Sequence, residues 1–184
     1  MLRELPNLIS IVRIILVVPI VYTLIKGMYD MALTLFVIAG ISDGVDGFLA
    51  KHFGWVTRLG GILDPLADKI LLISCYVVLG WQGDIPVWLV AAVIIRDVII
   101  VTGGIVYHFK IEVVEALPSI ISKINTFMQI IVVVAVMVNH GLWDMPSIML
   151  AMLFYITLVT TLASGFDYVW RWSARAVQVM KGKK

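Results

Sequence analysis

The sequence predicts an all-α integral membrane protein, built as a bundle of six transmembrane helices in a single domain over residues 1–184. Of its 184 residues, 61% are hydrophobic and 14% are charged, whereas a soluble domain carries roughly 25% charged residues. The mean hydropathy is +1.04. No low-complexity linker or soluble insertion interrupts the apolar segments, and the length suits one bundle without a second domain.

Apolar runs divide the chain into segments near the ~20 residues that a helix needs to cross the hydrocarbon core of a bilayer. Residues 1–7 precede the first run and predict a short interfacial segment. They lack the basic region and small-residue cleavage site of a signal peptide, so we expect the first span to be retained. The expected spans are residues 8–25, 31–50, 62–81, 86–107, 120–139 and 147–170.

The Lys and Arg residues are concentrated in alternate connecting segments. Residues 1–7, 51–59, 108–123 and 171–184 together hold ten of the fourteen. Cytoplasmic loops carry an excess of these cations, so both termini and the segment between the second and third spans are expected on the cytoplasmic side. The C-terminal segment, residues 171–184, mixes Trp with Lys and Arg and predicts an anchor on anionic lipid.

Four aspartates lie at the expected cytoplasmic ends of the second and third spans. Asp43 and Asp46 are three residues apart, and Asp64 and Asp68 are four apart, so each pair shares one face of a helix. A short loop makes the two helices antiparallel and brings the pairs face to face. Ionised carboxylates at a membrane edge need compensation, and divalent cations prefer such hard oxygen ligands. The alternative, that these acids only cap helices or line a water-filled vestibule, suits single aspartates better than four at two helical spacings.

The motif reads D-G-V-D-G-F-L-A-K from Asp43, then eight residues, then G-G-I-L-D-P-L-A-D to Asp68. It resembles the signature of the CDP-alcohol phosphatidyltransferase family, which are integral membrane enzymes of phospholipid synthesis. Lys51 stands where the family usually has Arg, which keeps the charge but loses the guanidinium fork.

The resemblance implies two divalent ions, Mg²⁺ or Mn²⁺, about 4 Å apart as in other two-metal sites. Asp64 and Asp68 are the implied catalytic residues, and Asp68 would both contact a metal and take the proton of the acceptor hydroxyl. The implied metal ligands are Asp43, Asp46, Asp64 and Asp68. The implied CDP-binding residues are Asp46, Gly47, Ala50, Lys51 and Gly60.

The implied reaction transfers a phosphatidyl group from CDP-diacylglycerol to an acceptor hydroxyl and releases CMP. By the same resemblance we expect a homodimer in the inner membrane of a bacterium or mitochondrion, with the active site and both termini on the cytoplasmic or matrix side. The expected partners are lipid substrates and the bilayer, and no nucleic acid.

Arg96, Lys123 and Asn125 are the candidate acceptor-binding residues. An Arg inside a span usually faces an aqueous cavity and binds an anion. Adjacent residues point in different directions on a helix, so we expect Asp97 not to neutralise Arg96. We favour anion binding over an ion pair between Arg96 and an acid of another span. For residues 122–126, a headgroup site and a simple helix cap with a snorkelling Lys123 both remain open.

Outside the motif, segments such as L-P-N-L-I-S-I-V-R, I-I-R-D-V-I-I and I-S-K-I-N-T are similar to the cardiolipin synthases of mitochondrial type. At the matching places, the phosphatidylglycerophosphate synthases instead have sequences similar to R-E-I-I-I-S-A-L-R and G-K-V-K-T. The second Arg of the first of these sequences is replaced here by Gly104, and the second Lys of the second by Asn125. Those two cations would suit glycerol 3-phosphate as the acceptor. A phosphodiester acceptor needs less positive charge, so phosphatidylglycerol is the expected acceptor and glycerol 3-phosphate the alternative.

Two further questions stay open at the level of sequence. Arg13, one to two turns inside the first span, either snorkels to the headgroups or acts near the aspartates. A membrane transporter would also show six spans with intramembrane charge, although it would more often show inverted repeats and broken helices. A purely structural membrane subunit would not need the aspartate cluster.

Overall fold

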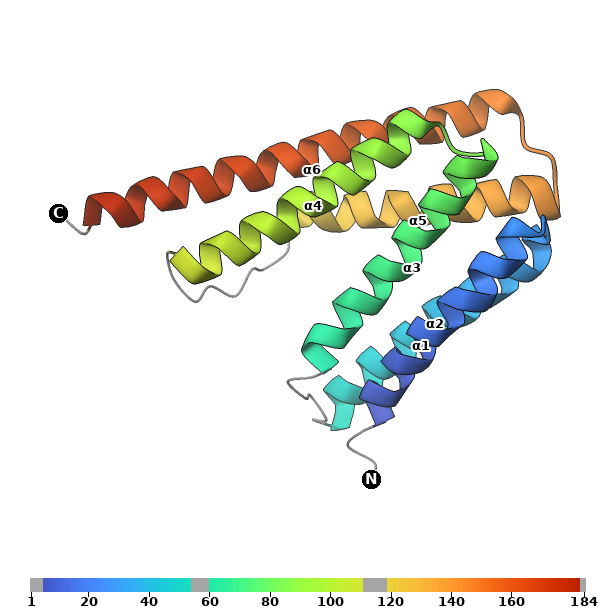
Figure 1. Cartoon of the computed structure of the whole chain (residues 1–184), viewed down its shortest axis with the longest axis horizontal. Coiled ribbons are helices and arrows are strands. Elements are labelled where there is room, and N and C mark those ends of the chain that lie inside the picture. The colour runs from blue at the N-terminus through green and yellow to red at the C-terminus, as the bar shows by residue number, and fades with distance from the viewer. Residues whose placement is uncertain (1–4, 54–59, 111–118, 183–184) are drawn as a thin grey trace. The chain divides into compact units, whose positions relative to one another are not determined.

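The computed structural model describes residues 5–53, 60–110 and 119–182, and these residues form α-helices joined by short turns, with no strand among them (Figure 1). The all-α prediction is confirmed. Side chains are described at 8–45, 64–103 and 119–171. The helices are α1 (Leu5–Ile25), α2 (Tyr29–Phe53), α3 (Gly60–Gln82), α4 (Val87–Lys110), α5 (Ile120–Gly141) and α6 (Ser147–Gly182).

The helix bounds lie close to the six predicted spans, with one extension at each end of the chain. Residues 5–7, expected to be interfacial, belong to α1, and the tail that we expected to anchor on lipid continues α6 to Gly182. Continuation of α6 places its basic residues on a helix rather than on an extended tail. Of the basic segments that predict the orientation, residues 54–59 and 111–118 lie outside the described residues.

Within the described residues, three helical segments are long and apolar enough to cross a membrane: Leu8–Ile25, Ile120–Gly141 and Ser147–Arg171. Their outward faces are apolar as well. Val18 on α1 is 70% exposed and Phe166 on α6 is 71% exposed. A helix that is apolar on its outer face as well as its inner face requires an apolar surrounding such as lipid. By length and composition these three helices therefore fit the membrane prediction.

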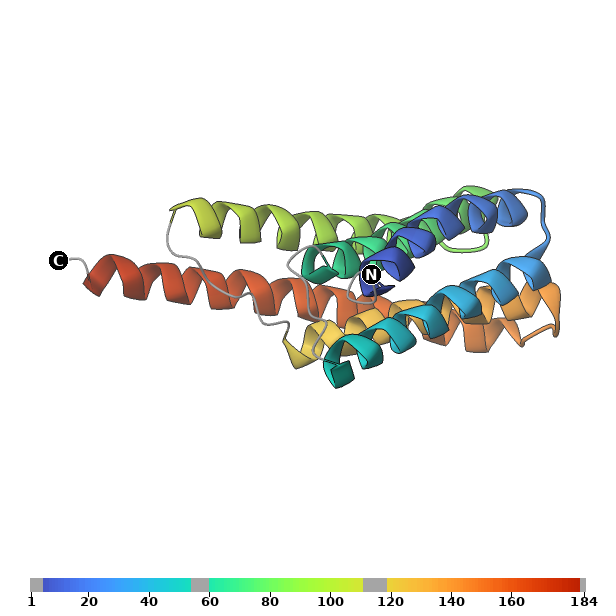
Figure 2. The same cartoon turned by 90° about the horizontal axis from the view of Figure 1, so that it is seen from below.

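The helices, drawn from a second direction in Figure 2, group into two compact units. The first contains Met1–Ile85 and Val133–Pro146, so it consists of α1, α2, α3 and the second half of α5. The second contains Pro86–Val132 and Ser147–Lys184, which are α4, the first half of α5, and α6.

In the first unit, α1 lies against both α2 and α3. Ile20 and Leu24 of α1 are fully buried, and so are the small residues Ala32 and Ala39 of α2. Small side chains let two helix backbones approach closely, which is the common way for helices to associate in lipid. Through these contacts α1 connects the two helices that carry the aspartate pairs.

Two glycine turns close the first unit at the end away from the aspartates. Gly27 has a φ of 72° and Gly83 a φ of 87°, a backbone conformation in which glycine meets no steric penalty. After α1, the N–H of Met28 donates to the carbonyl of Thr23, and after α3 the N–H of Asp84 donates to that of Leu79. Each helix thus ends in a Schellman motif, which satisfies carbonyls left open at the helix terminus.

Candidate active site

Arg13 of α1 joins the two helices that carry the aspartate motif. Its Nη1 atom lies 2.7 Å from Oδ1 of Asp43 on α2 and 2.7 Å from Oδ1 of Asp68 on α3. The Arg13 side chain is 0% exposed, whereas those of Asp43 and Asp68 are 44% and 45% exposed. The cation is therefore buried beneath two carboxylates that remain open to the outside.

Ser10 lies three residues before Arg13 and faces the same way on α1. It is fully buried, and its hydroxyl donates a hydrogen bond to Oδ1 of Asp64. Asp64 and Asp68 are four residues apart on α3 and so occupy the same face. One face of α1 thus orients both acids of α3 and one acid of α2.

The structure brings Asp43, Asp64 and Asp68 to the same Ser10–Arg13 face of α1. Asp46 lies one turn beyond Asp43 on α2, but its side chain lies outside the described residues. The same holds for the side chains of the other predicted CDP-binding residues. By their backbones Gly47, Ala50 and Lys51 are in α2, and Gly60 is the first residue of α3.

The donor chemistry of this cluster fits Mg²⁺ or Mn²⁺. All its acidic ligands are carboxylate oxygens, which hard divalent cations prefer. Two carboxylates from different helices already converge on one cationic atom, and both are half exposed. Among the described side chains, no three acidic, His or Cys groups are close enough to hold one ion together. Asp46, the fourth aspartate of the motif, is not among these described side chains.

Sequence reasoning left Arg13 open and missed Ser10. The structure places Arg13 at the aspartate cluster. A snorkelling side chain would instead leave the protein interior for the headgroups. The available signal was their spacing: Ser10 and Arg13 are polar residues three apart in the largely apolar segment 8–25. That spacing gives one polar face, although it does not say which helices the face meets.

Arg96 of α4 is buried, with 4% of its surface exposed, in the second unit. Its Nη1 lies 2.7 Å from Oδ1 of Asp97, and its Nη2 donates to the hydroxyls of Ser122 (2.5 Å) and Ser164 (2.6 Å). The expectation that Asp97 does not neutralise Arg96 is wrong. That expectation considered only the directions in which adjacent side chains leave a helix. The long side chain of Arg96 instead bends back to the buried carboxylate of Asp97.

Asn125 of α5 is fully buried near Arg96, one turn after Ser122. Its Oδ1 accepts hydrogen bonds from Thr160 (3.1 Å) and Thr161 (2.8 Å) of α6. Lys123, by contrast, is exposed. The structure therefore brings two of the three predicted acceptor residues into the interior between α4, α5 and α6, and leaves Lys123 outside it.

The first turn of α5 carries a helix cap. The N–H of Ser122 donates to the hydroxyl of Ser119 over 3.2 Å, which satisfies one of the amides left open at a helix start. The partners on α6 were missed by sequence reasoning. Their signal was the helical spacing of Thr157, Thr161 and Ser164, all buried polar residues in an apolar helix.

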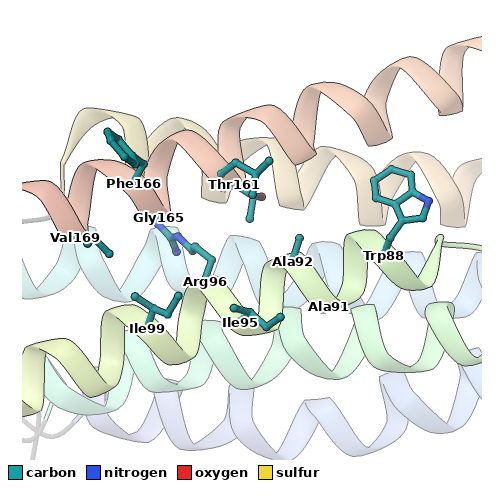
Figure 3. A pocket seen from close by; sticks show the side chains of 11 residues that line it. Trp88, Ala91, Ala92, Ile95, Arg96, Ile99, Thr161, Gly165, Phe166 and Val169 are labelled. Carbon is teal, nitrogen blue, oxygen red and sulfur yellow. The ribbon is translucent and has the colours of Figure 1, made fainter.

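An apolar groove of about 770 Å³ runs between α4 and α6. Figure 3 shows Arg96 between the two helices, with its side chain directed toward Gly165 of α6. A Cβ added at Gly165 would lie 3.6 Å from Cγ of Arg96, which is an ordinary van der Waals contact. The groove is lined by Trp88, Ala91, Ala92, Ile95, Arg96, Ile99, Thr161, Leu162, Gly165, Phe166 and Val169.

Comparison with known proteins supports the same family as the motif. The profile of the CDP-alcohol phosphatidyltransferase family matches residues 3–164. The chain is 33% identical over 196 residues to a cardiolipin synthase (CMP-forming) of Rattus norvegicus and 34% identical over 194 residues to that of Homo sapiens. These alignments cover 97% and 96% of this chain and 64% of each mammalian protein, so the chain spans somewhat less than two thirds of their length.

A second group of relatives carries a different name. The CDP-diacylglycerol–glycerol-3-phosphate 3-phosphatidyltransferase of Bacillus subtilis (strain 168) is 34% identical over 135 residues, which is 73% of this chain and 69% of that protein. The match to the family profile covers the aspartate motif from Asp43 to Asp68 and most of the six helices. The chain belongs to the CDP-alcohol phosphatidyltransferase family.

Proposed function

We propose that this protein is a membrane-embedded phosphatidyltransferase that moves a phosphatidyl group from CDP-diacylglycerol to an acceptor hydroxyl and releases CMP. The observation that carries the proposal is the convergence of Asp43, Asp64 and Asp68 on one face of α1. These acids belong to the motif by which the chain resembles its family. Family membership leaves the transporter interpretation without support.

The proposed catalytic site contains all four aspartates of the motif. Asp43, Asp46, Asp64 and Asp68 would hold two divalent ions, which the family generally uses. When bound, the ions neutralise the diphosphate and polarise the phosphorus under attack. Asp68 takes the proton from the attacking hydroxyl, because its carboxylate is half exposed and Arg13 holds one of its oxygens in place. Asp64, oriented by Ser10, is the other catalytic residue of this proposal.

The CDP moiety is proposed to bind along the end of α2 and the start of α3. Asp46, Gly47, Ala50, Lys51 and Gly60 are the residues that the family motif assigns to it. Small residues beside a charged cluster let a phosphate approach the backbone closely. Lys51 would meet one phosphate as a point charge rather than as a bidentate fork.

For the acceptor we propose phosphatidylglycerol, which makes the protein a CMP-forming cardiolipin synthase. Relatives of that name align with 97% and 96% of this chain. The apolar groove beside Arg96 suits an acceptor that carries acyl chains, while Arg96 and Asn125 supply polar groups at its inner edge. Glycerol 3-phosphate is the second candidate, and the similarity to the Bacillus subtilis protein favours it.

The membrane arrangement completes the proposal. The six helices form one multi-pass membrane domain over residues 1–184, in the inner membrane of a bacterium or mitochondrion. Both termini and the aspartates lie on the cytoplasmic or matrix side, which follows from the distribution of Lys and Arg. We further propose a homodimer, as the family resemblance implies.

The function is tested with the purified full chain in detergent. The protein is given CDP-diacylglycerol with equal amounts of phosphatidylglycerol and glycerol 3-phosphate, with Mg²⁺, with Mn²⁺ or with EDTA, and both CMP and lipid products are measured. We expect metal-dependent CMP release and cardiolipin. Phosphatidylglycerophosphate as the main product would reject the acceptor, and no metal-dependent CMP release would reject the function itself.

A further inference from the structure

Arg13 is among the largest fully buried side chains of the protein. It lies under the aspartate cluster on the protein side, and its Nη1 contacts Oδ1 of both Asp43 and Asp68. A buried cation is costly unless it is paired and hydrogen-bonded. Asp43 of α2 and Asp68 of α3 both pair with Arg13, so Arg13 links these two helices.

The contacts of Arg13 have an electrostatic consequence for any second cation. One positive charge offsets one of the two negative charges of Asp43 and Asp68, and the guanidinium occupies an oxygen of each carboxylate. A divalent ion held by the same carboxylates would lie a few ångströms from this buried positive charge. Repulsion between charges at such a distance is strong where the surroundings exclude water.

We propose that Arg13 is a positioning residue that holds Asp43 and Asp68 together and keeps the affinity of the site for divalent ions low until an anionic substrate is present. The inference rests on the proposed metal-dependent function. A nucleotide diphosphate brings negative charges that offset both the ions and Arg13. The ions and the CDP-linked substrate therefore bind cooperatively, and each strengthens the binding of the other by the same factor.

The experiment measures the affinity of the full chain in detergent for Mn²⁺, by electron paramagnetic resonance of free Mn²⁺, with and without CDP. Arg13→Gln removes the charge and keeps part of the hydrogen bonding. Arg13→Lys keeps the charge but loses the planar fork that spans two carboxylates. Arg171→Gln is the matched control, since Arg171 pairs with Asp167 of its own helix over 2.7 Å and its side chain is 54% exposed.

Without CDP, we expect Arg13→Gln to bind Mn²⁺ at least about tenfold more tightly than wild type, because a nearby repulsive charge is gone. Arg13→Lys should bind roughly threefold more tightly, since the ammonium no longer bridges both carboxylates. In both variants CDP should strengthen Mn²⁺ binding less than in wild type. Arg171→Gln should match wild type under both conditions.

Two results would overturn the inference, and they differ in what else they reject. If wild type binds Mn²⁺ but a folded variant at Arg13 binds it no more tightly without CDP, Arg13 does not limit metal affinity and the proposed function stands. Should Arg13→Gln fail to fold, Arg13→Lys alone decides in the same way. If wild type binds no Mn²⁺ with or without CDP, the metal site of the proposed function fails together with the inference.

Discussion

The hydroxyl of Tyr29, the first residue of α2, donates a hydrogen bond of 2.6 Å to Oδ2 of Asp84 in the turn between α3 and α4. His140 of α5 contacts the other oxygen of Asp84 over 3.3 Å, and its ring stacks on that of Tyr29 at 4.9 Å between centroids. These three residues join the ends of α2, α3 and α5 within the first unit. They lie at the end of that unit away from the aspartate cluster.

Removal of the Tyr29 hydroxyl should destabilise the first unit without affecting catalysis. Tyr29→Phe loses one hydrogen bond to a charged group, which is worth about 1.5–3 kcal/mol. Because Tyr29 is only partly buried, we expect the lower end of this range or less. Thermal unfolding in detergent measures the loss, and CMP release measured below the unfolding temperature is the control. Unchanged unfolding would show that the bond contributes no stability.

The same pair predicts a dependence of stability on alkaline pH. Burial and the hydrogen bond to Asp84 raise the pKa of Tyr29 to about 12 from 10.0. The folded protein therefore holds this proton more tightly than the unfolded chain, so the contribution of Tyr29 is complete below pH 10 and is lost as the pH rises toward about 12. The difference in unfolding temperature between wild type and Tyr29→Phe should shrink over that range. A constant difference would contradict the raised pKa.

Substitution of the metal-ligand candidates should abolish transfer. Asp43→Asn and Asp64→Asn each remove a charge from the proposed ligand set and keep the size of the side chain. CMP release should fall to background, while the chain still elutes as a folded species in gel filtration. Asp30→Asn is the matched control, because Asp30 is an exposed acid at the other end of α2. Near-normal activity in both site variants would reject the two-metal site.

Asp68 should affect the chemical step more than substrate binding. A general base acts in the transition state, so Asp68→Asn should lower kcat by ~10²-fold or more and change the KM for CDP-diacylglycerol little. Steady-state kinetics at saturating acceptor separate the two parameters. An Asp68→Asn protein that keeps its kcat and loses only affinity for the nucleotide would show that Asp68 is a ligand and not the base.

Filling the groove beside Arg96 should discriminate between the two acceptors. Gly165→Leu places a branched side chain in the groove and should reduce the use of phosphatidylglycerol more than that of glycerol 3-phosphate, which has no acyl chains. Gly165→Ala is the matched control, because its added Cβ meets Arg96 only at an ordinary contact distance of 3.6 Å. The ratio of lipid products with both acceptors present is the measurement. Equal loss for both acceptors would remove the groove from the acceptor site.

The helices could be predicted from the sequence because apolar length is a local property. The runs at 8–25 and 120–139 fall within α1 and α5, and α6 begins at the predicted residue. Its continuation past residue 170 was not predicted, since composition distinguishes an interfacial segment from a span but not a helix from a coil. The pairing of Asp43 with Asp46 and of Asp64 with Asp68 depended only on helical spacing and was equally accessible.

The contacts between helices could not be predicted from individual segments of the sequence. The partners of Arg13 lie thirty and fifty-five residues away, at Asp43 and Asp68, and no pattern within α1 specifies them. Arg96 shows the opposite error, because the directions of adjacent side chains on one helix were given more weight than the reach of a long guanidinium. The α6 hydroxyl that Arg96 contacts, that of Ser164, lies sixty-eight residues further along the chain.

The Schellman turns at Gly27 and Gly83 bear on where the lipid product can go. Each turn joins two helices within a few residues, and Tyr29, Asp84 and His140 fasten the helix ends together there. The acids of the motif lie at the other end of the first unit, so the proposed chemistry takes place at one end of that unit only. On the proposed function, the new phospholipid leaves into the same leaflet from which its precursor came. Its distribution to the opposite leaflet then requires a separate flippase or scramblase.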